Sequence, residues 1–124
     1  MIGKKELLKM LDIHLGGEEL YPVAIYSRFK YSKGIMDLIK GAECYWLFSD
    51  LSYNLTFNKK YKDDKVTFAI VKIKVFEDNR CEITLRDDID EEPWYREKYE
   101  YTNFPLDEFE VYLVDDTFLL KNEH

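Results

Sequence analysis

The sequence predicts an α+β fold, in which N-terminal helices pack on one face of an antiparallel β-meander. Apolar residues recur at helical spacing early in the chain, whereas from Val66 onward they alternate with polar residues as in strands. A run of helices followed by a run of strands is typical of this class. The 124 residues contain no linker, repeat or low-complexity stretch, so we predict a single domain over residues 1–124.

Two helices are expected in the first third of the chain. The first covers residues 3–17 and stops at the glycine pair 16–17, since glycine commonly ends helices. Its apolar face consists of Leu7, Leu8, Leu11 and Leu15. The second begins after Ser32, whose hydroxyl can cap its N-terminus, and closes at Gly41. Residues 44–55 are densely aromatic and fit a buried strand or a helix; Trp46 is expected in the core.

The second half of the chain predicts strands joined by tight turns. In residues 66–76, Lys72 and Lys74 face away from the alternating apolar side chains. Residues 81–86 alternate in the same way and form a hairpin with them through a turn at residues 78–79. Residues 96–104 give a third strand, and Asp115-Asp116 joins a closing hairpin. The polar residues 58–65 are expected to form a loop.

The charge balance limits the classes of partner. A net charge of −7 repels phosphate groups, so direct binding to DNA or RNA is not expected. An acidic surface can instead occupy the basic groove of a nucleic-acid enzyme in place of a phosphate chain. No apolar run approaches the roughly 18 residues of a transmembrane helix, so no membrane contact is expected. The N-terminus has neither a signal peptide nor a lipidation motif, which predicts a cytoplasmic location.

Catalytic equipment is sparse, and we predict no catalytic residue, no metal site and no cofactor. His14 is placed at the end of the first helix, where the helix dipole favours a cation, and His124 is the last residue. Cys44 and Cys81 lack partners at zinc spacing and are expected to be buried thiols. The scattered glycines do not form a phosphate-binding loop.

One alternative involves catalysis by carboxylates. Asp50 together with Asp63, Asp64 and Lys65 faintly resembles the acid-and-lysine set of a magnesium-dependent nuclease. The alternative hypothesis is therefore a small divalent-metal-dependent hydrolase or nuclease.

The strongest candidate site is an acidic run beside two aromatic residues. Its members are Asp87, Asp88, Asp90, Glu91, Glu92, Trp94 and Tyr95. Aromatic residues ringed by charge are typical of interface hot spots, which makes the run a candidate surface for a protein partner. A solvated loop that leads into a strand has the same composition, and the sequence leaves both interpretations open.

Residues 101–108, Tyr-Thr-Asn-Phe-Pro-Leu-Asp-Glu, closely resemble a signature of an uncharacterised family of small bacterial, phage and plasmid proteins. The family string has Asp where this chain has Asn103, and it is followed by a short closing hairpin, as here. The resemblance covers residues 19–120, although Pro22-Val23 stands where the family tends to have Arg-His. The resemblance implies an α+β fold and a mobile-element setting, hence a host cytoplasm. It implies no catalytic residue.

Binding rather than catalysis is the expected function. We expect a small acidic module that binds a protein with a basic surface. In the setting that the resemblance implies, its target is a host nucleic-acid-processing or defence protein, such as a CRISPR effector, which it inhibits. A structural subunit that assembles through an edge strand is a further possibility, and the sequence leaves the oligomeric state open.

Overall fold

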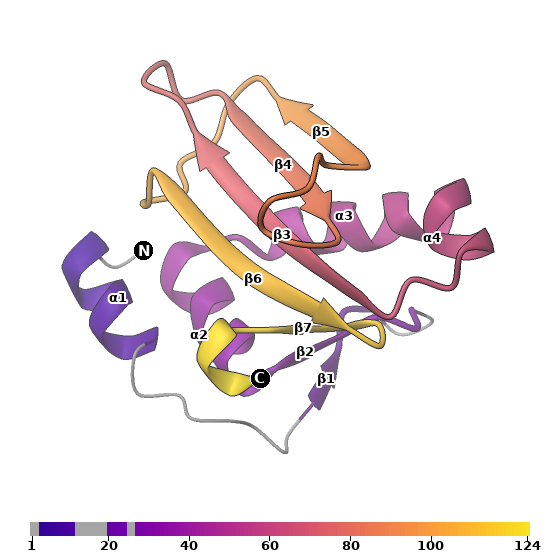
Figure 1. Ribbon diagram of the computed structural model, residues 1–124. Helices are drawn as coiled ribbons and strands as arrows, with labels where there is room; N and C mark the ends of the chain where they lie inside the picture. Colours follow the sequence, from indigo (N-terminus) through magenta and orange to yellow (C-terminus); the bar gives the residue numbers. More distant parts are fainter. Residues whose placement is uncertain (1–2, 12–19, 25–26) are drawn as a thin grey trace.

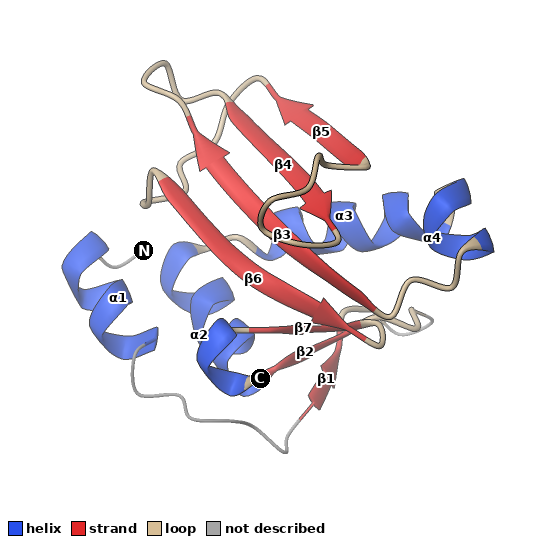
Figure 2. Ribbon diagram, in the orientation of Figure 1, coloured by secondary structure: helices blue, strands red, loops and turns tan. Residues whose placement is uncertain are grey.

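The chain forms one mixed sheet with helices against one of its faces (Figures 1 and 2). The computed structural model describes residues 3–11, 20–24 and 27–124. Within them the helices are α1 (Lys4–Leu11), α2 (Lys33–Ala42), α3 (Tyr45–Thr56), α4 (Lys59–Asp63) and the 3-10 turn η1 (Lys121–Glu123). The strands are β1 (Leu20–Pro22), β2 (Lys30–Ser32), β3 (Phe68–Val75), β4 (Cys81–Arg86), β5 (Tyr95–Tyr99), β6 (Glu108–Val114) and β7 (Thr117–Leu119). The predicted α+β class is confirmed.

The described strands follow the order β1-β2-β7-β6-β3-β4-β5. Strands β3, β4 and β5 form the predicted meander. The chain then crosses back, so that β6 pairs antiparallel with β3 on the other side. The closing hairpin places β7 parallel to β2, with Lys30 opposite Thr117 and Tyr31 opposite Phe118. Strands from the two ends of the chain therefore lie side by side near the β1 edge of the sheet (Figure 1).

One core lies between the sheet and the helices. Side chains on the inner faces of β3, β4 and β6 pack with the buried sides of α2 and α3, which pass behind the strands in Figure 2. The innermost positions are aliphatic, for example Leu38, Leu51 and Val71, none of which is exposed to solvent. The opposite face of β3, β4 and β5 is not covered by a helix (Figure 2), and that open face carries the charged residues.

The second helix begins as predicted and ends later than predicted. The Ser32 hydroxyl accepts a hydrogen bond from the Ile35 amide at 3.2 Å, which confirms it as the N-cap. Gly41 does not close the helix, because α2 runs through it to Ala42. Glu43 provides the end instead, in the left-handed conformation at φ 51°. Of the first helix, Lys4–Leu11 is described; its predicted end, including His14, lies outside the described residues.

The structure decides one open segment and corrects another. The aromatic segment, for which the sequence left strand and helix open, is the helix α3. The predicted loop at residues 58–65 is wrong in part, since it contains α4. Asn58 caps this short helix by accepting from the Tyr61 amide at 3.0 Å, and burial of the Tyr61 ring holds the turn against the core.

Candidate functional site

The predicted acidic run forms the connection between β4 and β5, called the acidic loop below (residues 87–92). Every one of its side chains is exposed. Two hydrogen bonds shape it: the Trp94 indole N–H donates to Asp87 Oδ1 at 3.1 Å, and the Ile89 amide donates to Asp88 Oδ1 at 2.7 Å. The loop therefore presents its five carboxylates to solvent on a defined backbone.

The two aromatic members of the predicted site lie beneath the loop. The half-buried Trp94 ring lies 6.5 Å from the Tyr61 ring, and the Lys60 ammonium group is 5.7 Å from the indole. Tyr95 is buried, and burial raises its pKa to about 12. The apolar residue of the acidic loop is Ile89, which is 63% exposed and was not among the predicted site residues.

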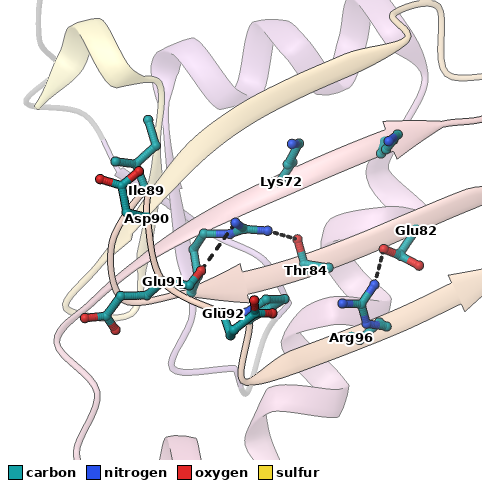
Figure 3. A pocket seen from close by; sticks show the side chains of 11 residues that line it. Lys72, Glu82, Thr84, Ile89, Asp90, Glu91, Glu92 and Arg96 are labelled. Atoms are coloured by element: carbon teal, nitrogen blue, oxygen red, sulfur yellow. Dashed lines mark hydrogen bonds and ion pairs between the residues drawn. The ribbon is translucent and has the colours of Figure 1, made fainter.

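A charged hollow of about 330 Å³ lies on the open face of the sheet beside the acidic loop (Figure 3). Its floor consists of outward-facing side chains of β3, β4 and β5, including Lys72, Thr84, Arg86 and Arg96. Its rim is residues 89–92 of the acidic loop together with Pro93. The sequence placed Lys72 and Arg86 on the outer side of their strands, but did not bring these cations to the acidic run.

The cations on the floor differ in how they are paired. Lys72 bonds Glu108 at 2.7 Å, and this bond lowers the pKa of Glu108. Arg96 bonds Glu82 across the β4–β5 ladder. Arg86 makes only long contacts, one of 3.4 Å to the backbone oxygen of Glu91 and one of 3.5 Å to the Thr84 hydroxyl. Its Nε is buried and has no hydrogen-bond partner among the residues that the structure describes. The Arg86 guanidinium group is therefore left with unused donor capacity.

A second surface feature is the outer side of α3, which exposes aromatic rings. Trp46 was expected in the core, but it is 36% exposed and its ring packs edge-on against Tyr99 at 5.3 Å. Tyr53 and Phe57 are 66% and 68% exposed, with ring centres 5.1 Å apart. The expectation for Trp46 failed because the segment is a helix, which has room for only part of its aromatic side chains on the buried face.

The carboxylates of the hydrolase alternative have other partners. Asp50 accepts hydrogen bonds from the Tyr99 hydroxyl and, at 3.4 Å, from the Asn54 amide group. Asp64 pairs with Lys60 at 3.0 Å. Across the described ranges, no group of three or more His, Cys, Asp or Glu side chains is arranged to hold a metal ion.

The remaining candidate groups lie in ordinary structural settings. The His124 ring packs against Tyr112 at 5.3 Å and Phe68 at 6.0 Å. Cys44 and Cys81 are buried thiols; burial raises their pKa values to about 12 and about 11. Among the helices described here, none has the length and apolar character that crossing a membrane requires.

Comparison with known proteins identifies a family. The family model DUF6876, described as a family of unknown function, matches residues 5–124. The chain belongs to this family. The match to DUF6876 confirms the expected membership of an uncharacterised family, and it spans the acidic loop, the hollow and α3 together. No curated protein and no solved structure gives a significant match to the chain. Membership of DUF6876 supplies no activity, so function has to be argued from the surface itself.

Proposed function

We propose that this protein is a binding module whose acidic loop docks on a basic surface of another protein. The observation that carries the proposal is the exposure of all five loop carboxylates on a backbone that Trp94 holds from below. The exposed Ile89 in their midst supplies an apolar contact within the charged ring. Interfaces commonly combine an apolar centre with a polar rim, and complementary charge speeds association and selects the partner.

The partner that fits this surface is a protein that normally binds nucleic acid. Such proteins carry basic channels for phosphate groups, and a row of carboxylates can occupy such a channel. In the mobile-element setting that the sequence resemblance implies, the partner is a nucleic-acid-processing or defence protein of the host, for example a CRISPR effector, met in the host cytoplasm. The module acts there as an inhibitor by occupancy and needs no turnover of its own.

The test compares two triple charge reversals that give the same net charge. One variant carries Asp88→Lys, Asp90→Lys and Glu91→Lys in the acidic loop. The matched control carries Glu77→Lys, Glu100→Lys and Asp107→Lys, three exposed acids at the opposite end of the β3–β4–β5 ladder. Affinity for purified CRISPR effectors and other basic nucleic-acid enzymes is measured by biolayer interferometry at several salt concentrations, with and without competing DNA.

We expect the loop variant to bind at least about tenfold more weakly than the wild type, because each reversal places like charges together at the contact. The control is expected to stay within about threefold, and added salt or DNA is expected to weaken binding by the wild type. Equal losses in the two variants would reduce the effect to net charge and reject the loop as the docking surface. If binding by the wild type does not change with added salt or DNA, the partner surface is not a basic nucleic-acid channel.

A further inference from the structure

The charged hollow keeps the cations of the sheet apart from the carboxylates of the acidic loop. Lys72 and Arg96 lie directly opposite Thr84 in the sheet register, one on each side, and Arg86 follows on the same face of β4. From the acidic loop, Asp90, Glu91 and Glu92 line the same space at the rim. Within the described part of the chain, no ion pair joins the loop carboxylates to any of these three cations. The hollow therefore has a cationic floor and an anionic rim with open space between them (Figure 3).

We propose that this hollow binds a small zwitterion of amino-acid size, with its carboxylate on the floor and its ammonium group at the rim. This proposal goes beyond the docking surface proposed above, because the ligand contacts the cations of the sheet in addition to the acidic loop.

The floor suits a carboxylate. Thr84 contributes a hydroxyl between two cations, and Arg86 contributes a planar group of donors whose present contacts are long. Guanidinium groups bind carboxylates through two parallel hydrogen bonds, and the two terminal nitrogens of Arg86 can supply them because their present contacts are long. Glu108 and Glu82 offset the charges of Lys72 and Arg96, so Arg86 and Lys74, which also lines the hollow, carry the positive charge that remains for a ligand carboxylate. Arg86 is the anchor of the two that can form paired hydrogen bonds.

The rim suits a cation. The side chains of Asp90 and Glu92 line the hollow, and no hydrogen bond or ion pair engages their carboxylates among the residues described. A ligand with an anionic group alone would meet their negative field, whereas an ammonium group at the far end of the ligand would be attracted by it. The volume of about 330 Å³ is at the lower end of the range for small-molecule sites, which limits the ligand to a few atoms beyond an amino acid.

Three matched probes separate the two ends of the site. γ-Aminobutyrate carries both charges, butyrate lacks the ammonium group, and butylammonium lacks the carboxylate. Each is titrated into the full-length protein at constant ionic strength while amide shifts are followed by two-dimensional NMR. We expect γ-aminobutyrate to shift the amides of Thr84, Arg86 and Glu92 with a dissociation constant of about 1–10 mM, a range typical of weak small ligands. The single-charge probes are expected to bind about tenfold more weakly, since each loses one charge-assisted contact.

Variants assign each end to its residues. Arg86→Gln is expected to weaken γ-aminobutyrate about tenfold and to leave butylammonium unchanged. The double variant Asp90→Asn/Glu92→Gln is expected to do the reverse. Lys98→Gln, an exposed change on the same sheet face outside the hollow, is the control and should leave all three probes unchanged. If Arg86→Gln does not fold, Lys72→Gln tests the same end of the site.

Two results would overturn the proposal. One is the absence of saturable amide shifts with γ-aminobutyrate up to about 50 mM, which would exclude the expected dissociation constant of about 1–10 mM. The other is equal binding of butyrate and γ-aminobutyrate, which would make the rim irrelevant to the ligand. Arg86→Gln leaves the carboxylates of the acidic loop in place. The zwitterion site can therefore be disproved while the docking of the loop on a protein partner still stands, and the reverse also holds.

Discussion

At the scale of single residues, Glu123 shows how one carboxylate can join distant parts of the chain. It accepts hydrogen bonds from the Ser32 hydroxyl at 2.5 Å, the Gly34 amide at 3.0 Å and the Leu120 amide at 2.9 Å. The contact depends on the missing side chain of Gly34, because a Cβ there would lie 2.4 Å from Glu123 Oε1. Ser32 could be identified as a helix cap from sequence, whereas its partner 91 residues away could not.

Gly34→Ala is therefore expected to destabilise the fold, although this change usually stabilises a helix by about 0.5–1 kcal/mol. The added methyl group displaces Glu123 and leaves its donors without an acceptor, so we expect the free energy of unfolding to fall by about 1–3 kcal/mol. Urea denaturation of Gly34→Ala, Glu123→Ala and the double variant measures the coupling. Because both changes break the same contact, the double variant should lose at least about 1 kcal/mol less than the sum. Additive losses would contradict the shared contact.

At the scale of elements, the β6–β7 turn combines local strain with a distant contact. Asp115 and Asp116 have φ angles of 48° and 65°, the left-handed conformation that tight hairpin turns require at both central positions. Asp116 also accepts a hydrogen bond from the buried Tyr61 hydroxyl and lies 3.7 Å from Arg28. The second turn residue therefore also holds α4.

Asp115→Asn is expected to raise the free energy of unfolding by about 0.5 kcal/mol, because Asn adopts the left-handed conformation more readily. Asp116→Gly is expected to lower it by about 1–3 kcal/mol, even though glycine relieves strain, because Tyr61 and Arg28 lose their acceptor. Thermal and urea unfolding of the two variants checks both signs. Stabilisation by Asp116→Gly would mean that the Tyr61 contact contributes nothing.

Elements with strong periodicity could be predicted, and those that depend on tertiary contacts could not. The alternation of apolar residues in β3 and β4 and the cap of α2 were readable because each is a local pattern. Strands β1 and β2 are three residues each and form only because β7 lies beside β2. The helix α4 has five residues, and it depends on a buried Tyr61 that sequence does not distinguish from an exposed one.

The candidate site shows the same limit. The acidic loop could be read from sequence because its carboxylates are contiguous. The hollow could not, since its cations come from three strands, and register and strand order decide which of them meet. The aromatic side of α3 was missed because the segment had no decisive period.

At the scale of the whole molecule, buried tyrosine hydroxyls and cysteine thiols make the free energy of unfolding depend on pH in the alkaline range. Burial raises the pKa of Tyr95 to about 12, of Cys44 to about 12 and of Cys81 to about 11, from ordinary values of 10.0 and 9.0. Burial, and next the hydrogen bond to Asp50, raise the pKa of Tyr99 as well. The folded state therefore holds protons that the unfolded state releases between pH 9.0 and about 12.

Stability is accordingly expected to be unaffected by these groups below pH 9.0 and to fall as pH rises toward about 12. Urea midpoints measured at intervals across that window test the direction. Tyr95→Phe removes one of the groups and should reduce the slope above pH 10.0, whereas Tyr53→Phe, a change at an exposed ring, should leave it unaltered. An unchanged slope in Tyr95→Phe would contradict the assignment.

The parallel contact between β2 and β7 has a consequence for folding. Within the described strands, β1 and β2 reach the rest of the sheet through β7, which pairs residues 30–31 with residues 117–118. Such long-range closure is slow, because loop entropy opposes it until the last strand docks. Until β2 docks, the outer side of β7 is an unpaired edge, open to strands of other chains. The protein is therefore most prone to aggregate during its synthesis, when many incompletely folded chains are close together.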